Sequence, residues 1–263
     1  MQPSPASKPP LDVLRLRRLL AGNRLAGEVI YKPQTGSTNN DALAAARGTA
    51  PEGTLFITDF QTQGRGTRGR TWRSPGNTSL LLSVILRPTR VLKPVELTQL
   101  AALGLCNGLR ESTSLDVRIK WPNDAMVRDK KIGGVLVEPL PGSAMAAVVG
   151  IGANLNLAAS DIGLAEGSVT SVLDETGSRC DRELVIAAVV DALERSYRAL
   201  EDGGSLFEDW TAQSAVIGRS VSLRTETRTY VGAVSGFDPG GELLLDCEDG
   251  TRRRFTAGRL ELL

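Results

Sequence analysis

The segment QTQGRGTRGRTW, residues 61–72, combines three glycines and three arginines with no acidic side chain. Glycine lets backbone N–H groups approach an anion closely. Arginine supplies a planar, permanently charged fork that matches phosphate or carboxylate. The segment therefore predicts a loop that holds an anionic ligand. A solvated Arg/Gly turn and an RNA-binding Arg/Gly tract remain alternatives.

A phosphate-binding P-loop is disfavoured by the residues that follow. Residues 64–71, GRGTRGRT, differ from G-x-x-x-x-G-K-[ST] only in having Arg70 where the motif has lysine. That motif opens a helix whose N-terminus faces the phosphates, and Pro75 and Gly76 prevent such a helix here. We expect instead a loop that is mobile without its ligand, because like charges repel and glycine loses entropy on ordering.

The charge of this region contrasts with the charge of the whole chain. The 263 residues carry a net charge of +1, which argues against a dedicated nucleic-acid binder. Between Phe60 and Val95, however, the sequence contains no Asp or Glu. The basic side chains of that stretch are Arg65, Arg68, Arg70, Arg73, Arg87, Arg90 and Lys93. A segment whose charged side chains are all positive, in a protein of nearly zero net charge, again indicates a local anionic ligand.

The composition excludes several function classes. The chain contains no histidine, which removes the usual Ser-His and Cys-His nucleophile pairs and the usual His-containing metal sites. Its three cysteines are far apart in the sequence, which indicates a reducing cytoplasm rather than a disulfide framework. No apolar run reaches membrane-spanning length. Residues 1–10 are rich in Pro and Ser, and we expect a disordered leader there.

Hydrophobic periodicity predicts an α+β protein. Strand patterns occupy residues 53–61 and 78–86, and a hairpin pattern occupies 130–140 and 144–157. Helical spacing occupies residues 11–22, 94–111 and 182–200. From residue 217 to 263 the sequence pattern changes to short strand-like stretches separated by the turn sequences DPGG and EDGT. This pattern predicts a small all-β domain. We therefore expect a main domain over 11–216 and a second one over 217–263.

Two further motifs carry polar groups at strand ends. In KWPND, residues 120–124, Lys120 ends an apolar strand beside a rigid proline and can point into a cleft. Asn123 and Asp124 could bind a metal–nucleotide, although a plain surface turn is an alternative. GIGANLN, residues 150–156, lacks the third glycine and the following helix of a dinucleotide fingerprint. It better fits a strand end that lets a ligand approach, with Asn154 as a hydrogen-bond donor.

Taken in order, TGSTNNDA, QTQGRGTRGRTW, KWPNDAMV…KKIGGVLVE and GIGANLN resemble the biotin–protein ligase family, over roughly residues 29–263. The resemblance implies a class II synthetase-like catalytic domain, with a mixed β-sheet flanked by helices, and an SH3-like C-terminal β-barrel. It also implies an activity that uses ATP, Mg²⁺ and biotin. Biotin would be activated to biotinyl-5′-AMP and transferred to a lysine of a biotin carboxyl carrier domain of a carboxylase.

The same resemblance implies roles for individual residues. Lys120 and Arg65 would be the catalytic cations, and Asp124 is a candidate for activating the acceptor lysine; the metal ligands stay unassigned. The implied biotin site comprises Ser37, Thr38, Asn39, Gln61, Gly64, Arg65, Gly66, Thr67 and Lys120. The implied ATP and adenylate site comprises Arg68, Arg70, Trp72, Asn123 and Asn154.

Two departures from the family pattern matter. Thr67 stands where the family commonly has a basic residue, so retention of the adenylate could be weaker here unless Arg68 compensates. The region before residue 29 predicts one helix, whereas a helix-turn-helix needs two, so we expect a monofunctional ligase that does not bind DNA.

A homodimer, with the strand in 144–157 crossing a two-fold axis, stays open. The rivals are a lipoate–protein ligase and a nucleic-acid-binding protein, the latter disfavoured by an aromatic content of 4%.

Overall fold

The computed structural model describes residues 9–143, 145–162 and 168–263, and most of the expected leader lies outside these ranges. Its centre is a seven-stranded mixed sheet in the order β1-β2-β3-β7-β6-β5-β4. Strands β1 and β2 run parallel, and every other neighbouring pair is antiparallel. The strands are β1 (Glu28–Thr35), β2 (Thr54–Gln61), β3 (Ser79–Leu86), β4 (Val117–Lys120), β5 (Asp124–Val127), β6 (Lys130–Pro139) and β7 (Ala147–Asn154).

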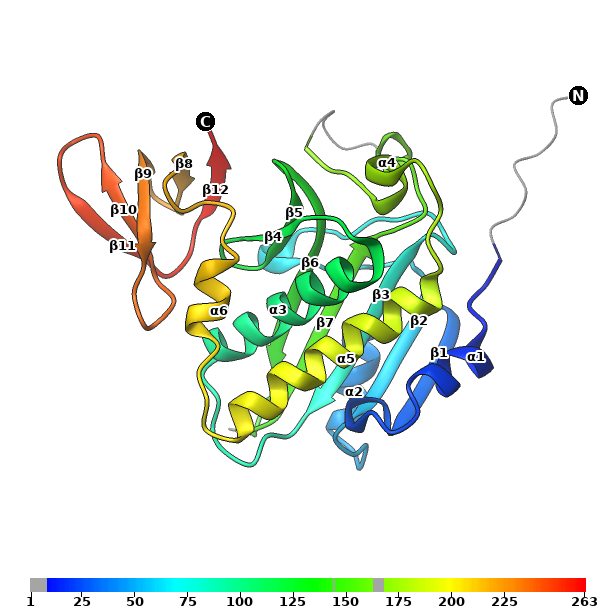
Figure 1. Cartoon of the computed structure of the whole chain (residues 1–263). Helices are drawn as coiled ribbons and strands as arrows, with labels where there is room; N and C mark the ends of the chain where they lie inside the picture. Colours follow the sequence, from blue (N-terminus) through cyan, green and yellow to red (C-terminus); the bar gives the residue numbers. More distant parts are fainter. Residues whose placement is uncertain (1–8, 144, 163–167) are drawn as a thin grey trace, which may run out of the picture.

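One face of this sheet is covered by two long helices, α3 (Pro94–Thr113) and α5 (Arg182–Glu201) (Figure 1). They approach closely because Gly104 and Gly108 of α3 face α5. A Cβ added at Gly108 would lie 2.4 Å from Val189 Cα. Helical periodicity predicts both helices, and the structure confirms them. The close approach of their axes depends on the two small residues.

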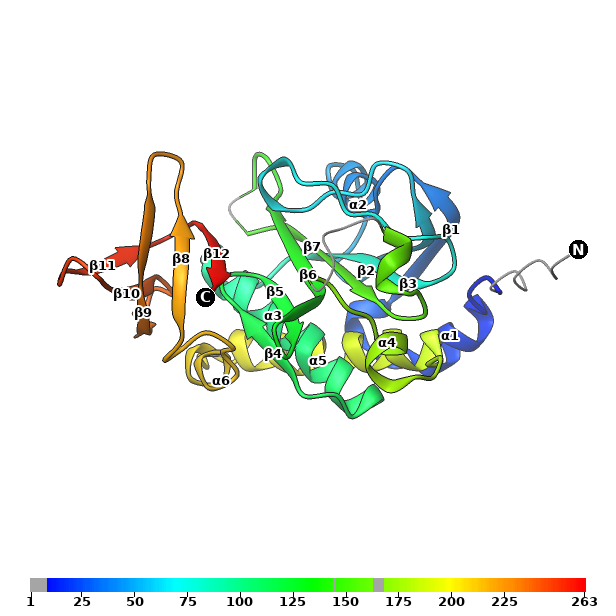
Figure 2. The same cartoon turned by 90° about the horizontal axis from the view of Figure 1, so that it is seen from above.

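The opposite face carries α2 (Thr38–Ala46) and the Gly/Arg segment (Figure 2). Strand β3 is buried along its whole length because it is covered on both sides. Its apolar residues Leu80, Leu82, Val84 and Leu86 belong to the core beneath the helices. Ser83 points the other way, to Thr38 and Asn39. Since side chains alternate along a strand, β3 contributes to the core on one face and to a polar site on the other.

Strand β7 shows the same division of its two faces. Ala147, Val149, Ile151 and Ala153 lie in the main core, whereas Gly150, Gly152 and Asn154 line a cavity on the other face. The hairpin predicted from residues 130–140 and 144–157 is confirmed as β6 and β7. Because β7 is also paired with β3, both its edges are occupied. β7 therefore has no free edge for pairing with a strand of a second copy, and the homodimer stays a prediction.

The N-terminal helix is shorter than its sequence pattern. The prediction of a helix in residues 11–22 is confirmed as α1 (Val13–Leu19), which begins after Asp12, whose side chain accepts from Arg15 N. Arg15 also forms a bidentate ion pair with Asp181, at 2.9 and 2.6 Å. This pair attaches α1 to the start of α5. The remaining helices are α4 (Val172–Thr176) and α6 (Phe207–Ala212), with 3-10 turns at Arg24–Ala26, Thr67–Gly69 and Ala159–Ile162.

The all-β prediction for the C-terminal region is confirmed. Five antiparallel strands form a separate sheet in the order β11-β10-β9-β8-β12 (Figure 1). Trp210 of α6 packs on Phe237 with ring centroids 4.5 Å apart, and Trp121 Nε1 donates to Gly241 O at 3.1 Å. These contacts join the sheet to the larger domain. The strands are β8 (Ser220–Arg224), β9 (Thr229–Phe237), β10 (Leu243–Cys247), β11 (Arg252–Phe255) and β12 (Arg259–Leu262).

In the described part of the chain no helix is both long and apolar enough to cross a membrane.

Candidate active site

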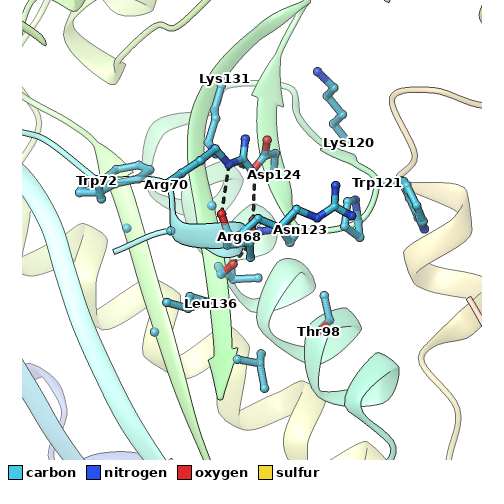
Figure 3. Close-up of a pocket in the computed structure, with 18 of the residues that line it drawn as sticks. Arg68, Arg70, Trp72, Thr98, Lys120, Trp121, Asn123, Asp124, Lys131 and Leu136 are labelled. Carbon is cyan, nitrogen blue, oxygen red and sulfur yellow. Dashed lines mark hydrogen bonds and ion pairs between the residues drawn. The ribbon is translucent and has the colours of Figure 1, made fainter. Parts of the chain in front are cut away.

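A cavity of about 1140 Å³ lies on the face of the sheet that carries α2, and it extends to the C-terminal sheet. Its walls come from the start of α2, the Gly/Arg segment, the start of α3, the β4–β5 turn, β6, β7 and β12. Figure 3 shows the part formed by the Gly/Arg segment, α3, the β4–β5 turn and β6. Of the residues expected in the site, only Gly64 is missing from the walls among the described residues. The expected residues that line the cavity are Ser37, Thr38, Asn39, Gln61, Arg65, Gly66, Thr67, Arg68, Arg70, Trp72, Lys120, Asn123, Asp124 and Asn154.

One end of the cavity is uncharged and rich in hydrogen-bonding groups. Gln61 Oε1 accepts from Thr38 N at 2.9 Å, which satisfies one of the free N–H groups at the start of α2. Ser83 Oγ lies 2.7 Å from Thr38 Oγ1 and 2.5 Å from Asn39 Oδ1. Ser37 is the N-cap residue of α2, but its hydroxyl makes no capping hydrogen bond. The result is a rigid set of amides and hydroxyls that suits a neutral polar ligand group.

The Gly/Arg segment forms a short hairpin, called here the flap (residues 64–72). Gly66 N donates to Arg70 O at 2.7 Å, and Trp72 N donates to Gly64 O at 2.9 Å. Between them, Arg68 adopts a left-handed conformation with φ of 57°, and Arg70 folds back so that its Nη2 donates to Thr67 Oγ1 at 2.8 Å. Gly64 does not line the cavity, and a Cβ added there would lie 2.5 Å from Trp72 O.

Two lysines and Asp124 line the cavity, and one of the lysines contacts the carboxylate. Lys131 Nζ donates to Asp124 Oδ1 at 2.5 Å and lies 5.8 Å from the centre of the Trp72 ring. Lys120 sits on the side of Trp121 (Figure 3), where it feels the charges of Asp124 and of the C-terminal pair Arg259 and Glu261. Burial lowers the pKa of the Lys120 ammonium from its usual value, and the charge of Asp124 acts in the opposite direction.

Trp72 and Asn154 form a wall with unsatisfied polar atoms. The Trp72 ring packs on Gly152, where an added Cβ would lie 3.0 Å from it. Asn154 Nδ2 donates to Thr170 O at 3.0 Å, but within the described residues its buried Oδ1 has no partner, nor does the buried Trp72 Nε1. A buried polar atom without a partner is costly, so these two atoms indicate where a ligand supplies hydrogen bonds.

The KWPND motif is a buried hairpin turn between β4 and β5, so the surface-turn alternative is wrong. Trp121 and Asn123 are both buried, and the bond between Trp121 and Pro122 is cis. Asn123 Nδ2 donates to Val135 O at 2.8 Å. That hydrogen bond holds the turn against β6, which places Lys120 and Asp124 at the cavity.

Three residues of this region were missed by the sequence interpretation. Lys131 contacts Asp124 directly, Ser83 orders the polar end, and Glu138 binds Arg65. Lys131 and Glu138 lie inside the quoted segment KKIGGVLVE, where a strand pattern alone does not distinguish them. A charged residue at each end of the uncharged stretch 132–137 was the available signal.

The comparisons with known proteins agree with this architecture. Residues 26–156 match the Biotin/lipoate A/B protein ligase family, and residues 216–263 match the Biotin protein ligase C terminal domain. The biotin–[acetyl-CoA-carboxylase] ligase of Mycobacterium tuberculosis is 32% identical over 253 residues, which is 91% of each chain. The bifunctional ligase/repressor BirA of Bacillus subtilis is 33% identical, over 87% of this chain and 72% of its own length.

A solved structure is similar as well. The biotin protein ligase of Aquifex aeolicus in complex with biotin and ATP has a TM-score of 0.76 and 26% identity, covering 90% of this chain and 99% of the other. The family matched by residues 26–156 includes both biotin and lipoate ligases. The family matched by residues 216–263 is named for biotin protein ligases alone, so it narrows the class to these enzymes. The chain therefore belongs to the Biotin/lipoate A/B protein ligase family and, within it, to the biotin protein ligases.

Proposed function

We propose that this chain activates biotin with ATP to biotinyl-5′-AMP and transfers the biotin to a lysine of a biotin carboxyl carrier domain of a carboxylase. One observation carries the proposal: a single cavity joins an uncharged polar end, a cationic flap and two lysines. The relatives named above, and the A. aeolicus ligase with biotin and ATP, support it.

The uncharged end suits the cyclic urea of biotin, which offers N–H donors and a carbonyl acceptor. We assign Ser37, Thr38, Asn39 and Gln61 to this end, because their amides and hydroxyls are neutral and already oriented. Gly150 makes this possible, since a Cβ there would lie 2.0 Å from Asn39 Oδ1. The flap residues Arg65, Gly66 and Thr67 would close over the bound vitamin.

The cationic centre suits the reaction itself. A carboxylate oxygen of biotin attacks the α-phosphorus of ATP, a new O–P bond forms, and the bond to pyrophosphate breaks. Two anions must approach each other, so fixed positive charges lower the barrier. Lys131 lies beside Trp72 and is hydrogen-bonded to Asp124, and we propose it as the central cation. Lys120 would serve from the outer side, with Arg68 and Arg70 of the flap.

The wall of Trp72 and Asn154 suits adenine. The ring of Trp72 offers a flat apolar surface. Asn154 Oδ1 is a buried acceptor that the exocyclic amine of adenine can satisfy. Asn123 acts through the turn that it anchors, because its amide nitrogen is bound to Val135 O.

Magnesium fits this site only as a companion of the nucleotide. In the described residues no three His, Cys, Asp or Glu side chains form a metal cluster. Magnesium is usually held by one or two carboxylates together with substrate phosphates, and Asp124 is the cavity carboxylate that is hydrogen-bonded to Lys131. The ion would supply neutralisation of phosphate charge.

The transfer step requires the acceptor amine to lose its proton before it attacks the mixed anhydride. Asp124 is the proposed base, since it lines the cavity beside both lysines. The amine nitrogen then bonds to the biotinyl carbonyl carbon, and AMP leaves. We place the reaction in a reducing cytoplasm, because all three cysteines are free.

Biotin-dependent exchange of pyrophosphate into ATP tests the first half-reaction. We expect exchange with biotin and none with lipoate. Streptavidin detection of a purified carrier domain tests the second half-reaction. Exchange with lipoate alone would instead support a lipoate ligase. Salt-dependent binding of single-stranded DNA without any exchange would favour the nucleic-acid alternative.

A further inference from the structure

The flap is tied to the sheet through one carboxylate, that of Glu138 near the end of β6. Arg65 Nη1 donates to Glu138 Oε1 at 3.0 Å, and Arg65 Nη2 donates to Oε2 at 2.6 Å. Within the described residues, this is the one side-chain ion pair between the flap and the rest of the chain. The other hydrogen bonds of the Arg and Thr side chains in the flap stay inside it, between Arg70 and Thr67.

The same carboxylate also holds the polar end of the cavity. Asn39 Nδ2 donates to Glu138 Oε2 at 2.8 Å, the oxygen that receives Arg65 Nη2. The other atom of the Asn39 amide, Oδ1, accepts from Ser83 at 2.5 Å. Glu138 itself does not line the cavity. It therefore bridges a residue of the proposed biotin site and a residue of the flap.

The side-chain amide of Asn39 is held in one orientation by its neighbours. Its Nδ2 faces two acceptors, Leu136 O at 3.3 Å and the Glu138 carboxylate. Its Oδ1 is confined by Ser83 and by Gly150. A ligand that binds to Asn39 in this arrangement therefore also stabilises the position of Glu138 Oε2, which accepts from Arg65. Conversely, a closed flap holds the Glu138 carboxylate where it accepts the hydrogen bond from Asn39 Nδ2.

We propose that Glu138 is a positioning residue that latches the flap and couples its closure to occupancy of the Ser37–Asn39 end of the cavity. The assignment of biotin as the occupant rests on the proposed function. The side chains of Arg65 and Glu138 are 38% and 24% exposed, so the pair alone contributes modestly to stability. The flap makes few other polar contacts with the sheet, so a modest interaction is enough to shift its open and closed populations. By linkage, flap closure and ligand binding then favour each other equally.

Trypsin provides a readout that does not depend on activity, because the flap contains Arg65, Arg68 and Arg70. Native-state cleavage at these bonds, followed by mass spectrometry, reports how often the flap opens. We expect E138Q to be cleaved there about threefold to tenfold faster than wild type, because a bidentate charged pair is lost. The matched control is E248Q, which removes an exposed carboxylate of the C-terminal sheet and should leave flap cleavage unchanged.

Biotin and a charge swap complete the test. Biotin should slow flap cleavage in wild type and have a smaller effect in E138Q. The double variant R65E/E138R should regain slow cleavage after Arg68 and Arg70, which a purely structural role of Glu138 does not predict. Equal flap cleavage in wild type and E138Q, without any ligand, would overturn the latch. So would faster cleavage spread evenly over the chain of E138Q.

A different result would contradict the proposed function without contradicting the role of Glu138. If calorimetry detected no binding of biotin to wild type, the biotin assignment would be wrong. The ligand-free cleavage rates would still decide whether Glu138 holds the flap.

Discussion

The two faces of the seven-stranded sheet use the same strands for different purposes. On the face beneath α3 and α5, β3 and β7 present leucine, valine, isoleucine and alanine to a continuous core. On the opposite face, Gly150, Gly152 and Asn154 of β7 border the cavity and Ser83 of β3 orders its polar end, whereas Ile85 and Val148 join a smaller apolar cluster with α2. Stability and function are therefore separated by side-chain alternation rather than by distance along the chain.

Glycine appears on both faces for different reasons. Gly108 allows two helices to approach, with Val189 as the near neighbour. Gly150 and Gly152 allow Asn39 and Trp72 to approach a strand from the cavity side. The comparison predicts that substitutions on the helix face reduce stability first and that substitutions on the cavity face reduce ligand binding first.

The largest effect is expected on the cavity face, at the lysines beside Asp124. Lys131→Ala should reduce biotin-dependent pyrophosphate exchange by about 10²–10³-fold, because a fixed charge at the reacting phosphate is removed. Lys120→Ala should also lose exchange while it keeps the wild-type thermal melt. Lys130→Ala is the matched control, since Lys130 adjoins Lys131 but does not line the cavity. Wild-type exchange in Lys131→Ala would contradict its central role.

On the helix face, Gly108→Ala should lower the free energy of unfolding by about 1–3 kcal/mol, because the new methyl group meets the backbone of α5. Urea denaturation measures the change, and biotin affinity measured on the folded fraction should stay the same. Gly27→Ala is the control, since a Cβ there meets nothing within 4 Å. A loss of affinity without a loss of stability would contradict the division between the faces.

Gly150→Ala tests the cavity face, where we expect ligand affinity to fall more than stability. The new Cβ would lie 2.0 Å from Asn39 Oδ1, so Asn39 must move and the polar end loses its arrangement. We expect biotin to bind about tenfold more weakly, equivalent to about 1.4 kcal/mol. Calorimetry measures the affinity. A smaller change in affinity than in unfolding free energy would count against the cavity-face assignment.

The smallest effect is expected in the flap, at Thr67. Thr67→Arg adds a cation at the cavity and releases Arg70, which now donates to Thr67. We expect the adenylate to dissociate a few-fold more slowly, the size of a partly exposed charge interaction. Thr49→Arg adds the same charge at an exposed position outside the cavity and serves as the control. Equal release of adenylate from Thr67→Arg and wild type would argue against a role for this position.

Local patterns predicted the elements, and their long-range arrangement was only partly predictable. The amphipathic spacing in residues 182–200 predicted α5, and the alternation in residues 53–61 predicted β2; both are confirmed. The position of β7 inside the sheet was not predictable, since it depends on pairing with β3 across more than sixty residues. Lys131 and Glu138 were missed for the same reason, because their partners Asp124 and Arg65 come from other elements.

By itself the sequence determined the α+β class, the change of texture at residue 217 and a cationic Gly/Arg loop, because these follow from periodicity and composition within short windows. Only the tertiary structure decided which lysine lies beside Trp72, that the KWPND turn is buried, and that one carboxylate holds both Arg65 and Asn39. The physical reason is that hydrogen bonds and ion pairs of a few ångströms join residues distant in the chain. Their geometry is set by strand pairing and by the close approach that glycine permits.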